Sequence, residues 1–305
     1  MTVRVSCEQT EDCSVLLVDI LLSGLILGGM YALVAMGLTL QYGVARILNL
    51  AYGEVMVAAA FLAYVLFTGA AIVPLVGLVV VLPLAFAANW LVYRVMLVPL
   101  VRRAKNRAAL ETDSILATFG LLFVLQGIAF VIFGGQYYGY AFLSTPVSLF
   151  GATVAVNRLV ALGFAAVLAI GLYLLLTRTR TGTAIRAVAV DPTAARLVAI
   201  DVDRIAALAF AAGGALCAAG GVLVSMFLTF NAAMGVLFTM KALIVVIMGG
   251  VGNLLGALAA GLLLGLIETA VARLVDPGLT LAANYALFLA VLLVRPTGLF
   301  GKVAR

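Results

Sequence analysis

The chain has 305 residues, of which 66% are hydrophobic and only 10% are charged, and its mean hydropathy is +1.28. Soluble domains carry about one quarter charged residues, so this composition indicates an integral membrane protein. Histidine is absent, which removes the commonest metal ligand and the usual general base near neutral pH. We interpret the net charge of +6 as topological rather than as a sign of nucleic-acid binding, because Lys and Arg concentrate in cytoplasmic loops.

The apolar runs predict helices, because strands of a membrane barrel would alternate over about ten residues. The fold class is therefore an all-α integral membrane protein, a polytopic transmembrane helical bundle of about eight to ten spans. The expected apolar segments, in chain order, are Val15 to Val44, Val55 to Thr68, Ile72 to Tyr93, Ser114 to Phe133, Leu159 to Leu176, Ile205 to Phe230, Val236 to Met248, Leu254 to Ala272 and Thr280 to Val294. The first is long enough for a tilted span or one with a break, and 236–248 is short enough to be re-entrant.

Three regions follow from this pattern. Residues 1–14 form an acidic leader without the basic start of a cleavable signal peptide, 15–294 form the transmembrane domain, and 295–305 form a tail. Cys7 and Cys13 of the leader either form a bridge or remain free thiols. The third cysteine, Cys217, lies in an apolar run and is expected to be a packing residue.

Basic residues set the expected orientation. Thirteen of the 18 Lys and Arg residues fall at Arg94 with the predicted loop 98–113, in segment 177–204, and in the tail. Alternating spans place all three regions on one side, which the distribution of Lys and Arg assigns to the cytoplasm. The leader is then extracytoplasmic, and the number of crossings is odd, about nine.

Segment 177–204, which we call the elbow, is the longest stretch without a run able to sit in lipid. It carries five arginines and reads as two short helices, the first from Thr183 to Val190. Asp191 is an N-cap acceptor and Pro192 is tolerated at the first helical position, so the second helix should start there and run to about Ile200. We interpret the elbow as a docking surface for a motor protein on the cytoplasmic side.

Charged residues inside apolar segments are costly, and are therefore candidates for function. Glu54 follows Asn49, Tyr52 and Gly53, so it is either a pathway carboxylate beside a helix break or a carboxylate stabilised by the helix dipole. Arg46 lies in the same polar joint.

Two further charges lie late in the chain. Lys241 either pairs with Glu54 or Glu268 inside the bundle or extends to an interface, and we favour the ion pair. Glu268 is expected to be interfacial and structural, near the outer end of its span. Glu54 is also expected to lie near an end of its span. Segment 249–253 contains three glycines, Gly249, Gly250 and Gly252. They permit irregular backbone, which indicates either a pathway element or a tight turn.

The chain contains no GxxxxGK[ST] phosphate-binding loop. ATP hydrolysis would therefore require a separate subunit. An ion-coupled secondary carrier is the alternative, and it predicts several acidic groups at mid-membrane depth. A membrane enzyme is disfavoured because no nucleophile with a base, and no cluster of metal ligands, is recognisable.

The chain resembles the LivH-type integral membrane permeases of bacterial branched-chain amino acid ABC importers from about residue 15 to 301. The resemblance is carried by residues 24–54, 182–204, 240–257 and 295–301. It implies two ATP-binding cassette subunits, a second related permease and a periplasmic solute-binding protein. The second permease is expected to form a heterodimer with this chain, with a homodimer left open. The resemblance also implies that the ATPase docks on the elbow, at Gly182, Arg186, Ala187, Asp191 and Leu197.

The predicted function is that of a permease subunit in the bacterial inner membrane, without a cofactor or a metal. The resemblance implies branched-chain amino acids as the solute. Family members usually have Asn-Phe-Ala-His-Gly-Glu where residues 49–54 read Asn-Leu-Ala-Tyr-Gly-Glu. They also differ at Val190 and Leu255. Urea, short amides and aromatic acids are therefore alternative solutes.

Overall fold

The computed structural model describes residues 10–103, 107–149 and 151–301. Eight helical segments in this part of the chain are long and apolar enough to span a membrane. They are built from α1 (Thr10–Ala45), α2 (Tyr52–Ala70), α3 (Pro74–Val92), α5 (Arg107–Phe133), α6 (Val156–Arg178), α9 (Val202–Ser225), α11 (Leu254–Leu274) and α12 (Thr280–Val294). The predicted all-α polytopic bundle is confirmed. The possible bridge between Cys7 and Cys13 lies outside the residues and side chains that the structure describes.

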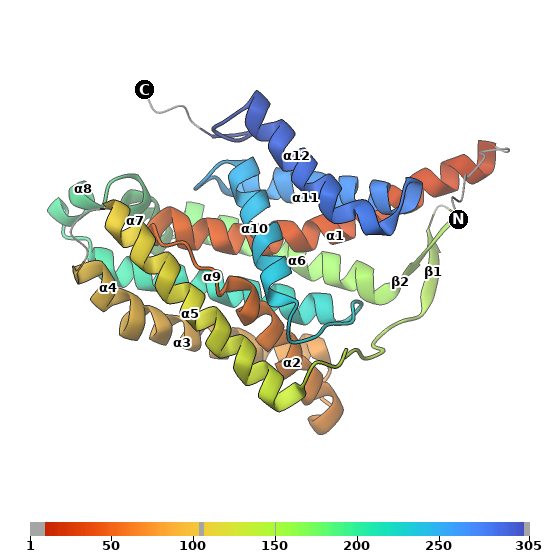
Figure 1. The fold of residues 1–305 in the computed structure, drawn as a ribbon, viewed down its shortest axis with the longest axis horizontal. Helices are drawn as coiled ribbons and strands as arrows, with labels where there is room; N and C mark the ends of the chain where they lie inside the picture. The colour runs from red at the N-terminus through yellow and green to blue at the C-terminus, as the bar shows by residue number, and fades with distance from the viewer. Residues whose placement is uncertain (1–9, 104–106, 150, 302–305) are drawn as a thin grey trace.

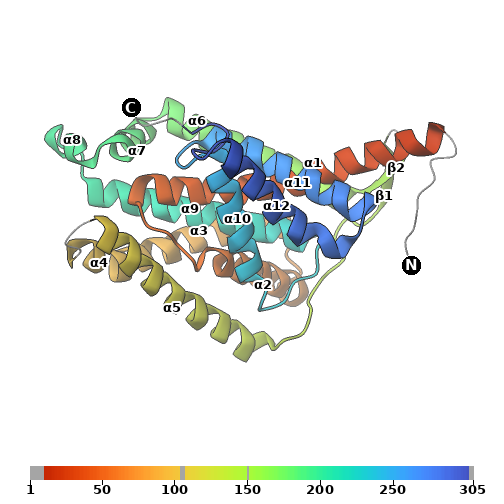
Figure 2. The same ribbon diagram turned by 45° about the horizontal axis from the view of Figure 1, so that its top comes forward.

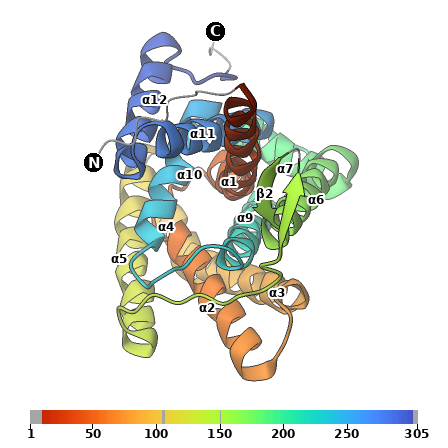
Figure 3. The same cartoon turned by 90° about the vertical axis from the view of Figure 1, so that its right-hand side faces the viewer.

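The long helices run along one direction of an elongated molecule (Figure 1). Seen from the end that carries the β-hairpin, α1 and α9 lie in the interior, and α5, α6 and α12 lie towards the outside (Figure 3). Among the candidate spans α9 is the most buried. Small residues allow this packing: a methyl group on Gly28 of α1 or on Gly261 of α11 would overlap the backbone of the other helix. Glycine at such positions lets helices approach closely in lipid.

Three basic regions meet at one end of the bundle, which carries α4 (Val98–Arg103), α7 (Arg180–Val190) and α8 (Pro192–Leu197) (Figure 1). A guanidinium nitrogen of Arg102 lies 3.9 Å from Asp203 at the start of α9. Asn253 donates to the carbonyl of Phe300 in the segment after α12. The prediction that the three regions share one side is therefore confirmed for their described residues. We call this end of the bundle the elbow end.

The opposite end carries the start of α1 and a two-stranded antiparallel hairpin, β1 (Pro146–Leu149) and β2 (Ala152–Ala155). A guanidinium nitrogen of Arg273 at the end of α11 lies 3.0 Å from Asp19 of α1.

Helix α10 (Gly235–Gly249) is shorter than the other spans. Before it, Phe230 pairs with Tyr138 at the hairpin end of the molecule. After it, Leu299 donates to the carbonyl of Met248 at the elbow end, at 2.8 Å. The extended segment and α10 together therefore traverse the bundle, which agrees with the odd number of crossings expected from the sequence.

Two expectations about segments are corrected. The expected loop 98–113 is largely helical, because α4 and the start of α5 occupy its described residues. The span expected to reach Phe230 ends at Ser225. The first apolar stretch is one continuous helix, which is the first of its two expected forms. A π-helical turn, Tyr93–Leu97, joins α3 to α4, and a 3₁₀ turn, Pro277–Leu279, precedes α12.

Candidate functional site

The chain between α1 and α2, residues 46–51, is an ordered non-helical connection inside the protein, which we call the inner joint. Asn49 is buried, accepts a hydrogen bond from Ala51 N at 3.1 Å and donates to Gln41 at 3.2 Å. Thr118 of α5 accepts from Leu50 N at 3.2 Å and donates to Leu48 O at 3.1 Å. These side chains satisfy backbone groups that a helix would otherwise satisfy, as irregular backbone at membrane depth requires.

Helix α2 begins deep in the bundle rather than at its surface. The Tyr52 hydroxyl donates to Val34 O at 2.7 Å and to Gly213 O at 3.1 Å, in the middle of α1 and α9. Cys217 donates to Tyr52 O from the same part of α9. Cys217 is buried among these helices, as its apolar surroundings predicted.

Glu54 lies in the first turn of α2 and is 2% exposed. Its carboxylate lies against the first residue of α10, since a methyl group on Gly235 would overlap it. Glu54 lies near the start of the candidate span Tyr52–Ala70, as the sequence predicted. The inner joint places that start inside the bundle rather than at its surface.

The starts of α2 and α10 touch each other directly. Gly53 N donates to the hydroxyl of Thr239 at 2.8 Å, and the same hydroxyl donates to Gly235 O at 3.1 Å. A methyl group on Gly53 would overlap Gly235 O, so glycine is required for this approach. The residue before each helix, Ala51 or Met234, provides no side-chain cap. Two positive helix ends therefore converge beside the Glu54 carboxylate.

Lys241 of α10 forms the ion pair expected from the sequence, with Glu268 as its partner. Its ammonium nitrogen lies 2.7 Å from Glu268 Oε1 and 2.6 Å from the Tyr31 hydroxyl oxygen, to which it donates. The Tyr31 hydroxyl donates to the same carboxylate at 3.2 Å, and Asn284 donates to its other oxygen at 2.8 Å. The cluster thus joins α10 to α1, α11 and α12.

Glu268 lies near the C-terminal end of α11 and has a structural role, as the sequence predicted; it is 9% exposed and accepts hydrogen bonds from three side chains. Hydropathy along one helix did not show that Lys241 would approach from another. Glu268 is therefore a member of a satisfied ion pair, and Glu54 does not belong to that cluster. The described residues thus lack the chain of acidic groups that an ion-driven carrier was expected to require.

The glycine segment 249–253 is a turn between α10 and α11. Gly250 has φ +97° and Gly252 has φ +82°, which favour glycine. Gly249 lies against the backbone of Gly256 in α11. The turn also meets the chain after α12, where Phe300 N donates to Gly249 O at 3.3 Å. It lies at the elbow end of the bundle, so the structure brings it close to neither Glu54 nor the start of α2.

The elbow consists of two short helices, as the sequence predicted, and it projects from one end of the bundle (Figure 2). Asp191 accepts from Thr193 N at 2.8 Å and Ala194 N at 3.2 Å, so it caps α8, with Pro192 in the first turn. Gly182 packs against the end of α6, where a methyl group would overlap Leu175 O. Arg186 is exposed and Ala187 is half-buried.

An apolar surface lies at the tip of the elbow. Val190, Leu197 and Val198 are 84%, 85% and 69% exposed. They lie at the ends of α7 and α8, among basic residues. Their place on a polar projection is typical of a contact with another protein.

One side chain joins the elbow to the inner joint. Arg46, the first residue of the joint, donates from its guanidinium to the carbonyl of Ala189 in α7 at 2.9 Å. Its φ of +56° is unusual for a residue with a side chain. The sequence marked Arg46 as a costly charge, but its partner could not be identified because the two residues are 143 positions apart.

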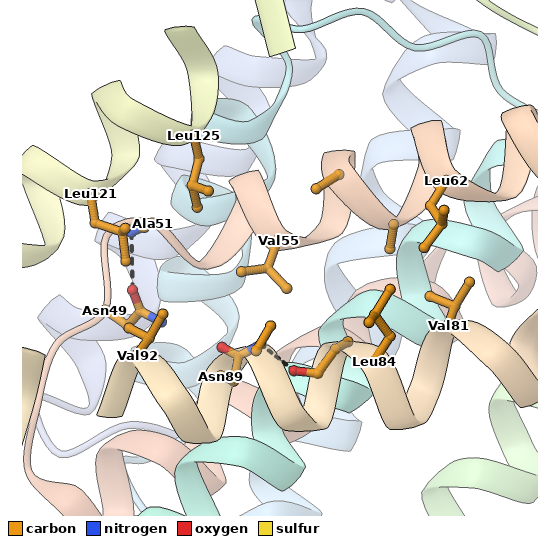
Figure 4. Close-up of a pocket in the computed structure, with 14 residues that line it drawn as sticks. Asn49, Ala51, Val55, Leu62, Val81, Leu84, Asn89, Val92, Leu121 and Leu125 are labelled. Carbon is orange, nitrogen blue, oxygen red and sulfur yellow. Dashed lines mark hydrogen bonds between the residues drawn. The ribbon is translucent and has the colours of Figure 1, made fainter. Parts of the chain in front are cut away.

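A cavity of about 190 Å³ lies beside the inner joint, between α2, α3 and α5 (Figure 4). Its walls are aliphatic apart from Asn49 and Asn89, and the Asn89 amide is satisfied by Ala85 O at 2.9 Å. Charged side chains do not line it. The cavity therefore offers space for apolar groups, or for a shift of α2, next to the joint.

The comparisons with known proteins agree with this architecture. Residues 20–295 match the family model described as branched-chain amino acid transport system / permease component. No solved structure matches the chain.

Several curated relatives match nearly the whole chain. The high-affinity branched-chain amino acid transport system permease protein LivH of Escherichia coli (strain K12) is 31% identical, covering 92% of this chain and 94% of the relative. The permease protein BraD of Pseudomonas aeruginosa is 29% identical, with coverage of 92% and 95%. A probable LivH of Methanocaldococcus jannaschii is 28% identical, with 92% of each chain covered. The chain is thus a multi-pass inner-membrane transport component, and it belongs to the family of branched-chain amino acid transport system permeases.

Proposed function

We propose that this chain is the membrane-spanning permease subunit of an ATP-driven importer of branched-chain amino acids. The names of the relatives support this solute class. ATP would be hydrolysed by two separate ATP-binding cassette subunits on the cytoplasmic side. A second permease would complete the membrane part, as a heterodimer, and a solute-binding protein would deliver the amino acid from outside.

We propose that the elbow is the surface on which an ATPase subunit docks. The apolar surface of Val190, Leu197 and Val198 supports this role, because burying exposed apolar side chains favours association. Arg186 and Asp191 lie on the same two helices and are exposed. Their charges would orient the partner, since charged groups around an apolar contact contribute mostly to specificity.

The contact between Arg46 and Ala189 carries the mechanism. An ATPase that moves α7 would pull on the guanidinium of Arg46 through the 2.9 Å hydrogen bond. Arg46 begins the inner joint, and the joint ends at the buried start of α2. Movement of the elbow would thereby reach the residues proposed to line the pathway, which are Asn49, Tyr52, Gly53 and Glu54. This mechanism gives no pathway role to the other four candidates, because they lie away from Glu54. They are Gly249, Gly250, Gly252 and Lys241.

The docking surface can be tested with two valines that match in exposure and local structure. Val198 ends α8 and is 69% exposed, and Val275 ends α11 at the opposite end of the bundle and is 68% exposed. Val198→Asp should reduce co-purification of the ATPase and amino-acid uptake by about 30-fold, the effect of losing one interface hot spot. Val275→Asp should leave assembly unchanged. Equal behaviour of the two variants would refute docking on the elbow.

A further inference from the structure

The chain contains an internal repeat, whose two copies are centred on the starts of α2 and α10. Residues 49–53 read Asn-Leu-Ala-Tyr-Gly and residues 231–235 read Asn-Ala-Ala-Met-Gly, so both follow the pattern Asn-x-Ala-x-Gly. The structure shows the same local geometry in both. Asn49 accepts from Ala51 N and Asn231 accepts from Ala233 N, each at 3.1 Å. Each motif leads from a long interior helix into the start of a shorter one.

The repeat extends to the neighbouring helices. In the first copy α2 follows α1 and packs on α9, while in the second α10 follows α9 and packs on α1. The third helices correspond as well, because α3 packs on α9 and α11 packs on α1. Since α1 ends at the elbow end and α9 ends at the hairpin end, the two copies run in opposite directions (Figure 1).

The two motifs meet at one point, where the glycines Gly53 and Gly235 face each other. Inverted repeats with interrupted helices commonly place a solute site where the repeats meet. The position after the glycine differs between the copies: it is Glu54 in the first and Val236 in the second. The meeting point therefore carries one carboxylate, not a symmetrical pair.

Within the part of the chain that the structure describes, the Glu54 carboxylate has no counter-charge. Its Oε1 atom is buried and has no hydrogen-bond partner among the described residues. Lys and Arg are absent from residues 52–93 and 205–240, which supply α2, α3, most of α9 and the start of α10. The next cation along α10, Lys241, is held by Glu268. A buried carboxylate must carry a proton or face a cation.

We propose that Glu54 binds the α-ammonium group of the amino acid during its passage, at the point where the two repeats meet. This inference rests on the proposed amino-acid solute. An inorganic cation would need several further oxygen ligands, and the Thr239 hydroxyl at the contact between the two glycines is already engaged by Gly53 N and Gly235 O. An ammonium group can be bound by one carboxylate with backbone carbonyls. Separation of the glycine-to-glycine contact would open the site.

The first test is Glu54→Gln in the complete transporter with its ATPases, reconstituted in proteoliposomes. Loss of one charge-assisted hydrogen bond should reduce L-leucine uptake by about 10- to 100-fold, while ATPase binding to the elbow is retained. Glu54→Asp should keep part of the uptake. Asp113→Asn, which alters an exposed carboxylate in α5, is the matched control. Wild-type uptake and KM in Glu54→Gln would show that Glu54 only carries a proton, and would overturn the proposal.

The second test does not depend on a variant that folds. A hydrophobic carbodiimide should label Glu54 of the wild-type transporter in nanodiscs. L-leucine and 3-methylbutylamine, which carry an ammonium group, should protect Glu54, whereas 4-methylpentanamide should not. Protection by the neutral amide as well as by the amine, or by none of them, would overturn the proposal. Failure of the wild-type transporter to take up any amino acid with its ATPases would instead count against the proposed function.

Discussion

Replacing Lys241 or Glu268 by Met tests whether the buried ion pair holds α10 in place. The ammonium nitrogen lies 2.7 Å from the carboxylate, and the two side chains are 15% and 11% exposed. Removing one member leaves the other charge buried and uncompensated. Each single variant should therefore lower the free energy of unfolding by about 3–5 kcal/mol, the usual effect of breaking a buried pair.

The double variant, with Met at both positions, should be more stable than either single variant, because it leaves no unpaired charge. It should still retain a cost of about 1–3 kcal/mol, since Asn284 loses its acceptor on Glu268. The midpoint of denaturant unfolding in mixed micelles measures these differences. Adding Asn284→Leu should recover most of the remaining loss.

A more exposed pair near the same end of α11 supplies the control. Arg273 and Asp19 are 3.0 Å apart but are 51% and 20% exposed. Arg273→Met should cost less than about 1 kcal/mol, because solvent screens such pairs. The loss in the double variant could instead equal the sum of the two single losses, or each single loss could be no larger than that of Arg273→Met. Either result would show that Lys241 and Glu268 do not act as a buried pair.

Two further predictions concern the elbow. Gly182→Ala should destabilise the contact between α6 and α7 by about 1–3 kcal/mol, because the new methyl group overlaps backbone. Gly171→Ala, inside α6 with open space around it, should instead stabilise by up to about 1 kcal/mol. Thermal unfolding midpoints compare the two variants. Asp191→Ala removes the cap of α8 and should cost about 1 kcal/mol. Hydrogen exchange of residues 192–197 should become faster in this variant while the rest of the chain is unchanged, and unchanged exchange would contradict the assigned cap.

The sequence predicted those parts of the structure that depend on neighbouring residues. Asp191 and Pro192 marked the start of α8 because capping is local. The charge of Lys241 predicted a buried partner, although two carboxylates were possible. Hydropathy likewise located the spans, because helices in lipid must be apolar.

Other features depend on which surfaces meet, which hydropathy does not report. Helices α5 and α9 are similarly apolar, yet α9 is largely buried and α5 is largely exposed. The depth of Glu54 could not be predicted because it depends on the route of the inner joint. The repeated Asn-x-Ala-x-Gly motif was a readable signal that pattern analysis missed, since the apolar residues around it conceal the similarity of the two copies.

The ratio of transport to ATP hydrolysis in an Arg46→Met transporter tests whether the elbow acts on the start of α2 through Arg46. Arg94→Met is the matched control, because Arg94 lies at the same end but stacks on Trp90 rather than on the elbow. Arg46→Met should keep ATP hydrolysis within about twofold of the wild-type rate, because docking is intact. Uptake should fall by about tenfold or more, as expected for a charge-assisted hydrogen bond. A ratio equal to that of wild type and of Arg94→Met would contradict it.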